Sequence, residues 1–390
     1  MALSSKEGAR PSVLVLMGCF SPGADASGPN QSLRAMCEAL GEDFDFRIAA
    51  RDRAFGARES QSTGPGWRRV SGARARYLEI GPLGARGLAA LLNETPHDLL
   101  MLNGFFDREF TLPALILRRG RLVTRRPVLL SPRGEFGAGA LSLKAGVKRA
   151  WLASALACGL LEGVTLHATG EEEAADIRRA LAGRLPTVTA PNARFLFARP
   201  TTQARAPGAP LRLAFLGRIS RIKNLDFALK VLARVKAPVI YDIYGPDSDP
   251  AYAKACQTLA ASLPSHVTVR FHGEVSNAEA PALLAAHDLL FLPTLGENFG
   301  HAIFEALAAG SPALISDRTP WRGLEARQAG GDLPLERPAL FAQAIDRFAA
   351  MSPADFLAWR DGARLEAERE TVQSDAVRQL REMLLRACGR

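Results

Sequence analysis

Residues 288–317 read DLLFLPTLGENFGHAIFEALAAGSPALISD, and the pattern of this stretch decides the fold. An apolar run that ends at Leu292 predicts a buried strand, a polar loop follows, and a helix begins near Gly300. Gly310 and Pro312 are typical stop signals of a helix, and the next apolar run predicts a second strand. Two strands joined by a helix form the repeating unit of a parallel sheet.

The same alternation extends outward through both halves of the chain. Further strands are predicted at residues 11–18, 45–50, 98–104, 127–134, 164–170, 211–218, 237–245 and 267–273. Helices are predicted at residues 30–42, 112–119, 141–156, 224–236, 251–263, 278–287 and 354–387. Strands that alternate with helices in this way indicate an α/β fold, in which parallel sheets are covered on both faces.

A proline-rich stretch at residues 199–210, RPTTQARAPGAP, separates the two halves and is typical of a linker. We therefore expect two doubly wound, Rossmann-like domains, at residues 1–200 and 206–370, and a last helix over residues 371–390. Such domains bind ligands in a cleft at the carboxyl ends of their strands.

Composition excludes several classes of protein. Hydrophobic residues make up 47% of the chain and charged residues 23%, which is typical of a globular protein. The longest apolar stretch, residues 152–161, is far shorter than the ~20 residues that span a bilayer. The five cysteines form no Cys-X-X-Cys pair, which argues against disulfides and a zinc site and favours a reducing, cytoplasmic compartment.

The positive charge is concentrated in the first half. The chain has a net charge of +9, and residues 1–205, with 28 basic and 19 acidic residues, account for all of it. This excess favours an anionic partner, such as nucleic acid, an acidic membrane surface or a phosphorylated substrate. A general bias toward arginine explains it equally well.

Two loops that follow predicted strands carry the chemistry. In the first, Glu297 lies on a loop and Glu305 lies in the helix behind it, while Gly296, Asn298 and Gly300 allow a ligand to approach the backbone. Carboxylates bind hydroxyl groups and helix N-termini bind anions, so this segment suits a polyol beside a phosphate.

In the second loop, Arg218 follows Gly217, and Lys223 precedes the next helix. Two cations in this position suit a diphosphate. The chain contains neither Gly-X-Gly-X-X-Gly nor Gly-Lys-Ser/Thr, so a dinucleotide oxidoreductase and a P-loop nucleotidase lose their main support. The Asp-X-Asp triplets at residues 43–45 and 247–249 lie in positions unsuited to a shared metal ion, and we expect no metal cofactor.

The segment from Pro293 resembles the Glu-X7-Glu signature of the family-four retaining glycosyltransferases, which have the GT-B fold. The resemblance extends through Ser316-Asp317 and Thr319-Pro320-Trp321, and to the SPRGE motif at residues 131–135. It implies two Rossmann-like domains that face each other across a cleft, with the donor bound by the C-terminal domain and the acceptor by the N-terminal domain. It also implies that the final helix crosses back to the N-terminal domain.

The resemblance assigns roles to individual residues. It implies that Arg218 and Lys223 hold the donor diphosphate and act with Glu297 in catalysis, and that Glu305 holds the ribose. The donor-binding residues implied in full are Gly28, Gly217, Arg218, Lys223, Gly245, Glu297, Asn298, Phe299, Gly300, His301 and Glu305. The acceptor-binding residues implied are Asn103, Arg133 and Glu135.

One position departs from the family. Many members carry a histidine in the loop that faces the anomeric carbon, and this chain has Arg133 there. Arginine does not act as a base at physiological pH, but it binds phosphates and carboxylates. His167 and His301 occupy motif positions, although a lone histidine is more often structural.

The resemblance implies a retaining, metal-independent hexosyltransferase that uses a nucleoside-diphosphate sugar. The acceptor would be a glycan, a lipid-linked compound or a small molecule such as a secondary metabolite. Arginines near one strand (118, 119, 121, 125 and 126) would face an anionic membrane surface, at the inner face of the membrane.

Two alternatives remain, a sugar-nucleotide epimerase of the same fold and a basic nucleic-acid-binding protein. Few aromatic residues, 7%, argue against the second, so we expect no nucleic-acid partner.

Overall fold

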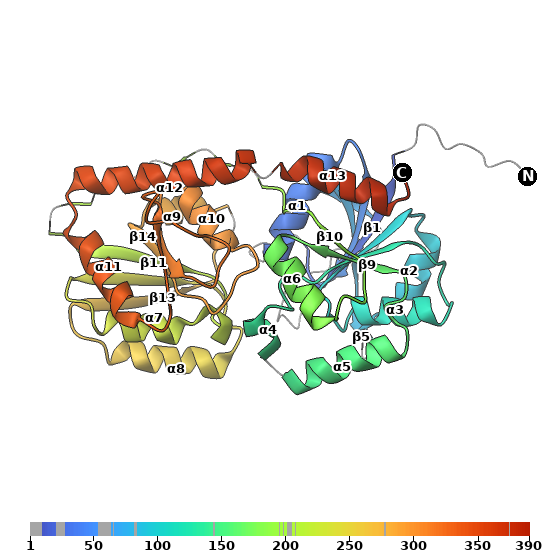
Figure 1. The fold of residues 1–390 in the computed structure, drawn as a ribbon, viewed down its shortest axis with the longest axis horizontal. Coiled ribbons are helices and arrows are strands. Elements are labelled where there is room, and N and C mark those ends of the chain that lie inside the picture. The colour runs from blue at the N-terminus through green and yellow to red at the C-terminus, as the bar shows by residue number, and fades with distance from the viewer. Residues whose placement is uncertain are drawn as a thin grey trace, which may run out of the picture. The chain divides into compact units, whose positions relative to one another are not determined.

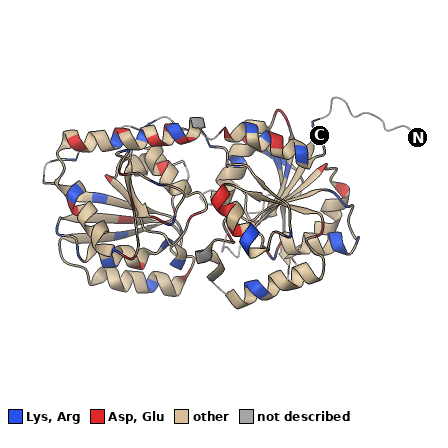
Figure 2. Cartoon of the chain, in the orientation of Figure 1, with Lys and Arg blue, Asp and Glu red and all other residues tan. Residues whose placement is uncertain are grey.

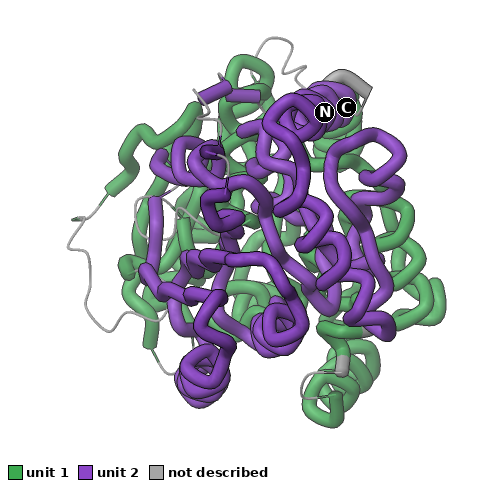
Figure 3. Tube along the Cα trace, turned by 90° about the vertical axis from the view of Figure 1, so that its left-hand side faces the viewer, with its two compact units in different colours: residues 1–194, 375–390 green, residues 195–374 purple. Residues whose placement is uncertain are grey.

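The structure is a computed structural model of the 390-residue chain. It describes all residues except 1–9, 21–27, 54–63, 65, 82–83, 143–144, 195, 198, 201–204, 207, 277 and 374. The chain divides into two compact units (Figure 3). Unit 1 comprises Met1–Arg194 and Asp375–Arg390, and unit 2 comprises Phe195–Ser374. Part of the linker expected at residues 199–210 lies outside the described residues.

Unit 1 is built on an eight-stranded sheet with the strand order β10-β9-β8-β7-β1-β2-β4-β3 (Figure 1). The strands are β1 (Ser12–Leu16), β2 (Asp45–Arg51), β3 (Arg68–Val70), β4 (Ala73–Leu78), β7 (Leu99–Asn103), β8 (Val128–Ser131), β9 (Val164–Ala168) and β10 (Thr187–Thr189). All neighbours in this sheet are parallel except β3 and β4. A separate antiparallel pair is formed by β5 (Ile80–Gly81) and β6 (Gly84–Ala85).

Helices cover both faces of this sheet. They are α1 (Gly28–Leu40), α2 (Leu88–Glu94), α3 (Thr111–Arg119), α4 (Ala138–Ser142), α5 (Ala145–Ala157), α6 (Glu171–Ala180) and α13 (Ala376–Ala387). Side chains alternate along β1: Leu14 and Leu16 join a core with α2, α3 and α6, whereas Val13 and Val15 join a core with α1 and α13. Burial on both faces explains why the central strands have nearly continuous apolar sequences.

Unit 2 contains a parallel six-stranded sheet in the order β13-β12-β11-β14-β15-β16. The strands are β11 (Leu211–Leu216), β12 (Val239–Tyr244), β13 (Val267–Gly273), β14 (Leu289–Leu292), β15 (Ala313–Ser316) and β16 (Gly330–Leu333). The helices are α7 (Leu225–Leu232), α8 (Pro250–Ala261), α9 (Ala280–Ala285), α10 (His301–Ala308), α11 (Pro338–Ala350) and α12 (Pro353–Gln373), with a short 3-10 helix at Arg221–Lys223. The parallel sheets of both units confirm the α/β fold predicted from the sequence.

The C-terminal segment corrects one prediction. A single helix was expected over residues 354–387, but the chain forms α12 in unit 2 and α13 in unit 1, with Asp375 at a φ of +42° between them. Leu380 and Leu384 of α13 belong to the same hydrophobic core as Val13 of β1, so the last helix is part of the N-terminal core. Both helices carry charges of both signs (Figure 2), and no proline or glycine marks the break.

Other differences are local. The helix expected at residues 141–156 is divided into α4 and α5. Strands β3, β4, β10 and β16 were not predicted, because they are short or rich in arginine and glycine. Gly28, which the resemblance places among the donor-binding residues, is the first residue of α1, where its carbonyl accepts a hydrogen bond from Ser32 Oγ. The residues just before it, 21–27, lie outside the described residues.

Candidate active site

Two glycines bring neighbouring loops of unit 2 into backbone contact. Gly217 follows β11 with a φ of +154°, and Gly245 follows β12 with a φ of +144°. The Gly217 N–H donates to Tyr244 O at 2.9 Å. A Cβ atom on Gly245 would lie 2.0 Å from Gly217 O, so this position requires glycine. The contact fixes the start of the loop that carries Arg218, whose side chain is exposed.

The two loops singled out in the sequence meet at an ion pair. Lys223 Nζ lies 2.5 Å from Glu297 Oε1, and the two side chains are only 18% and 11% exposed. The loops are also joined through their backbones, since Thr294 Oγ1 and Leu295 N both donate to Ile222 O, at 2.9 and 2.8 Å. Lys223 and Glu297 are 74 residues apart in sequence, yet both lie at the carboxyl edge of the sheet.

Asn224 strengthens the same junction. It adopts a left-handed conformation at the start of α7, with a φ of +59°, and its Nδ2 donates to Pro293 O at 3.0 Å. Asparagine tolerates this conformation better than most residues. Asn224 therefore helps to fix the position of the preceding residue, Lys223.

The segment after Glu297 enters α10 through a turn that requires glycine. Gly300 has a φ of +81°, and a Cβ atom there would lie 2.7 Å from Ile303 Cδ1. Trp321 Nε1 donates to Phe299 O at 2.6 Å and supports this turn. Asn298 is half-buried between Glu297 and the turn, and Glu305 is half-buried in the second turn of α10.

The Thr-Pro-Trp motif at residues 319–321 contributes to the support of the Glu297 loop. In the structure Trp321 packs against Phe299, with ring centroids 5.5 Å apart, and Ser316 Oγ donates to Thr294 O at 2.5 Å. Glu297 N donates to Arg318 O at 3.3 Å. These residues hold the Glu297 loop from behind, so the motif is a support rather than a contact surface.

In unit 1, the acceptor-binding residues implied by the resemblance meet at the carboxyl edge of the sheet. Arg133 lies just after β8 with a φ of +57°. Its Nε and Nη2 donate to Asn103 Oδ1 at 3.1 and 3.0 Å, and its Nη1 donates to Asn192 Oδ1 at 2.8 Å. Asn192 was not predicted as a site residue, because it follows the short strand β10, which carries little sequence pattern.

Glu135 lies on the same edge and is held by the backbone. Its Oε2 accepts hydrogen bonds from the N–H groups of Phe105 and, at 3.1 Å, Phe106. Burial raises its pKa to about 7, although these two amides lower it. Burial also raises the pKa of Asp107, whose Oδ1 accepts from Phe110 N and so supports the start of α3. This part of the edge can therefore hold a proton near neutral pH.

The histidines in motif positions differ in environment. His167 is 1% exposed, lies 2.9 Å from Ser131 Oγ through Nδ1 and lies 2.8 Å from Ala190 O through Nε2. Burial, together with the charge of Arg133, lowers its pKa to about 3, so the ring is neutral and structural. His301 is the first residue of α10, and its ring meets Phe299 edge-on at 4.9 Å.

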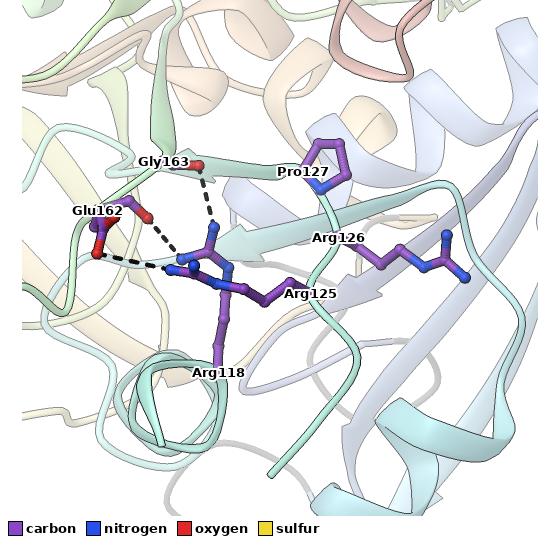
Figure 4. Close-up of a pocket in the computed structure, with 6 residues that line it drawn as sticks. All are labelled: Arg118, Arg125, Arg126, Pro127, Glu162 and Gly163. Carbon is purple, nitrogen blue, oxygen red and sulfur yellow. Dashed lines mark hydrogen bonds and ion pairs between the residues drawn. The ribbon is translucent and has the colours of Figure 1, made fainter. Parts of the chain in front are cut away.

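The arginines expected to face an anionic surface lie at the opposite edge of the unit 1 sheet. A pocket of about 330 Å³ is lined by Arg118, Arg125, Arg126, Pro127, Glu162 and Gly163 (Figure 4). Pro127 and Gly163 precede β8 and β9, so the pocket lies at the amino ends of the strands.

Two of the five arginines bind backbone carbonyl groups, and one of them is buried. Arg118 is 8% exposed and donates to Glu162 O at 2.6 Å, and Arg119 donates to Cys158 O at 3.0 Å. Arg125 lies 3.7 Å from the Glu162 carboxylate, and Arg126 points away from both (Figure 4). The expectation is thus wrong for the buried Arg118, whereas Arg119, Arg121, Arg125 and Arg126 are exposed and their role stays a prediction. Among the described helices, none is long and apolar enough to cross a membrane.

Comparisons with known proteins agree with this geometry. Residues 202–348 match the model of the glycosyl transferases group 1 family. D-inositol 3-phosphate glycosyltransferase of Streptomyces coelicolor is 31% identical over 130 residues, which cover 30% of this chain and 28% of the relative. The protein of the same name from Mycobacterium bovis is 31% identical over 105 residues, 27% of this chain and 22% of the relative. The chain thus matches less than a third of the length of these relatives.

Solved structures match over nearly the whole chain. Sucrose-phosphate synthase from Thermosynechococcus elongatus has a TM-score of 0.73 at 19% identity and covers 97% of this chain and 100% of its own. HepE of Anabaena, in complex with UDP and glucose, has a TM-score of 0.70 at 16% identity, with coverages of 96% and 99%. WaaG, a glycosyltransferase involved in lipopolysaccharide biosynthesis, has a TM-score of 0.65 at 14% identity, with coverages of 95% and 99%. The chain therefore has the GT-B fold, and its second half is similar to the group 1 glycosyl transferases.

Proposed function

We propose that the protein is a retaining glycosyltransferase that moves a hexose-type sugar from a nucleoside-diphosphate sugar to an acceptor hydroxyl. The observation that carries this proposal is the Lys223–Glu297 pair at the carboxyl edge of the unit 2 sheet, beside Gly217 and the start of α10. The match of residues 202–348 to the group 1 family supports it.

The donor diphosphate would be held by Arg218 and Lys223. Departure of the nucleoside diphosphate builds negative charge, and cations that are already in place stabilise it. Without donor, Glu297 neutralises Lys223. When the donor binds, one of its phosphates replaces Glu297 as the ion-pair partner of Lys223. The Glu297 carboxylate then accepts hydrogen bonds from the hexose hydroxyls.

The remaining donor contacts come from α10 and the loops around it. Glu305 would bind the ribose hydroxyls, and the backbone around Phe299 and Gly300 would approach the sugar. Gly245 would leave room beside the diphosphate loop, and His301 would border the same site. UDP-glucose is the first donor to test, together with its nucleotide product UDP, because the HepE structures contain them.

The acceptor would bind unit 1 at Asn103, Arg133 and Glu135. Retention would follow from attack on the same face that the leaving group vacates, with the donor phosphate accepting the acceptor proton. This route requires neither a protein nucleophile nor a metal ion. A glycan, a lipid-linked compound or a small molecule would serve as acceptor, and we place the reaction in the cytoplasm or at the inner face of a membrane.

Thermal-shift binding tests the donor class. UDP, GDP, dTDP, ADP and a DNA oligomer are added to the wild-type chain, to Glu305→Ala and to the control Glu325→Ala, whose side chain is exposed and pairs with Arg347. We expect one nucleoside diphosphate to stabilise the wild type and the control but not Glu305→Ala. Stabilisation by a DNA oligomer alone, abolished by salt, would reject the proposal. A change in the configuration of the donor sugar without any acceptor would instead indicate an epimerase.

A further inference from the structure

Arg133 has an unusual backbone and an unusual set of partners. It is a non-glycine residue at a φ of +57°, a conformation that the surrounding structure must impose. Its three hydrogen bonds go to the side-chain oxygens of Asn103 and Asn192, which flank it from β7 and from the end of β10. The fold therefore fixes the direction of this guanidinium group before any ligand arrives.

The charge of Arg133 lacks a direct counter-ion among the described residues. Glu173 lies near enough to influence its pKa, but Glu173 Oε1 accepts from Gly134 N at 2.6 Å and Oε2 accepts from Thr169 N at 2.7 Å. Burial lowers the pKa of Arg133 to about 10, which still leaves it charged at neutral pH. His167, close by, is kept neutral.

The guanidinium group also keeps hydrogen-bonding capacity. It has five N–H donors, and the described residues use three of them. A partly buried, oriented cation with donors to spare matches the two oxygens of a phosphate or carboxylate. The amide oxygens of Asn103 and Asn192 accept its hydrogen bonds, but they carry no net charge that would neutralise the guanidinium group.

We propose that Arg133 binds an oxyanion of the acceptor, so that the preferred acceptor carries a phosphate or carboxylate group. That the oxyanion belongs to an acceptor rests on the proposed function. The oxyanion site itself rests on the geometry around Arg133. It gives the arginine at this motif position a binding role.

Isothermal titration of the whole chain with glucose, glucose 6-phosphate and inorganic phosphate tests this inference. We expect glucose 6-phosphate to bind at least tenfold more tightly than glucose, and Arg133→Gln to abolish the difference. Asn192→Asp places a carboxylate 2.8 Å from Arg133 Nη1 and should also abolish it while preserving the packing. Arg125→Gln, at the opposite edge of the same sheet, is the matched control and should bind as the wild type does.

Each outcome has a distinct meaning, and circular dichroism and the thermal shift with UDP report on folding in every variant. Equal binding of the two sugars by the wild type, or an undiminished difference in both Arg133→Gln and Asn192→Asp, overturns the inference. Loss of UDP binding in Arg133→Gln with glucose 6-phosphate binding intact assigns the oxyanion to the donor and also overturns it. Oxyanion binding through Arg133 without any nucleotide binding overturns the proposed function and leaves the oxyanion site supported.

Discussion

At the scale of single residues, buried polar groups determine where protons and charges reside. His167 is neutral because it is buried beside Arg133, and Glu135 is held in a site where burial favours the protonated form. Lys223 and Glu297 instead neutralise each other at the edge of unit 2. In unit 1 the cation Arg133 is held in a fixed orientation. In unit 2 the cation Lys223 is paired with Glu297, and an anionic ligand can replace this partner.

Glu135 should make stability depend on pH. Its pKa in the folded chain is about 7 against an ordinary value of 4.5, so the folded state binds a proton that the unfolded state releases. The associated stability is complete below pH 4.5 and is lost as the pH rises through 7, by about 3 kcal/mol at most. Urea unfolding at pH 5 to 8 should show that Glu135→Gln is less sensitive to pH over this range.

The matched control is Glu172→Gln, an exposed carboxylate in the first turn of α6. Its unfolding free energy should follow the pH profile of the wild type. If Glu135→Gln has the wild-type profile as well, the carboxyl group of Glu135 does not retain a proton in the folded chain.

At the scale of elements, alternating strands and helices were predictable, because apolar runs buried on both faces differ clearly from amphipathic helices. The break between α12 and α13 was not predictable, because the helical pattern runs through Asp375 without a proline or glycine. The loops carrying Lys223 and Glu297 could be predicted as separate motifs. Their contact could not, because it depends on which strands are neighbours in the sheet, β11 beside β14.

Unit 1 was less predictable at the carboxyl edge of its sheet. Arg133 could be identified from its motif, but its partner Asn192 follows a three-residue strand that carries too little pattern to be recognised. The supporting role of Trp321 also depends on a tertiary contact, the hydrogen bond to Phe299 O.

A pair of glycines tests the packing of the unit 2 loops. Gly245→Ala should destabilise the unit by about 3 kcal/mol or more, because its Cβ meets the Gly217 backbone, and it should also weaken donor binding. Gly273 also has a positive φ, of +75°, but no atom lies within 4 Å of an added Cβ, so Gly273→Ala is expected to cost about 1 kcal/mol. Chemical unfolding of both variants measures the difference, and equal losses would refute the role of the Gly217–Gly245 contact.

At the scale of the whole molecule, the excess positive charge lies in residues 1–205, which fall mostly in unit 1. Arg125 and Arg126 are exposed at the amino edge of its sheet, away from the edge that carries Arg133. Attraction to an anionic surface would therefore leave the carboxyl edge of unit 1 accessible to an acceptor.

Vesicle co-sedimentation tests this surface. With anionic and neutral vesicles, Arg125→Gln/Arg126→Gln should lower binding to the anionic vesicles about thirtyfold, since each arginine near such a surface contributes about 1 kcal/mol. Arg234→Gln/Arg337→Gln, which removes two exposed charges from unit 2, should leave binding unchanged. If the wild type shows no preference for anionic vesicles, the proposed membrane surface is rejected.

The central claim is that Lys223 binds the donor diphosphate, and calorimetric titration with UDP tests it most directly. The wild type is compared with Lys223→Ala and with Lys230→Ala, an exposed lysine of α7 that pairs with Asp226 at 2.7 Å. We predict that Lys223→Ala binds UDP at least ~100-fold more weakly, equivalent to about 2.7 kcal/mol, and that Lys230→Ala binds as the wild type does. Binding of UDP by Lys223→Ala with wild-type affinity would contradict the account.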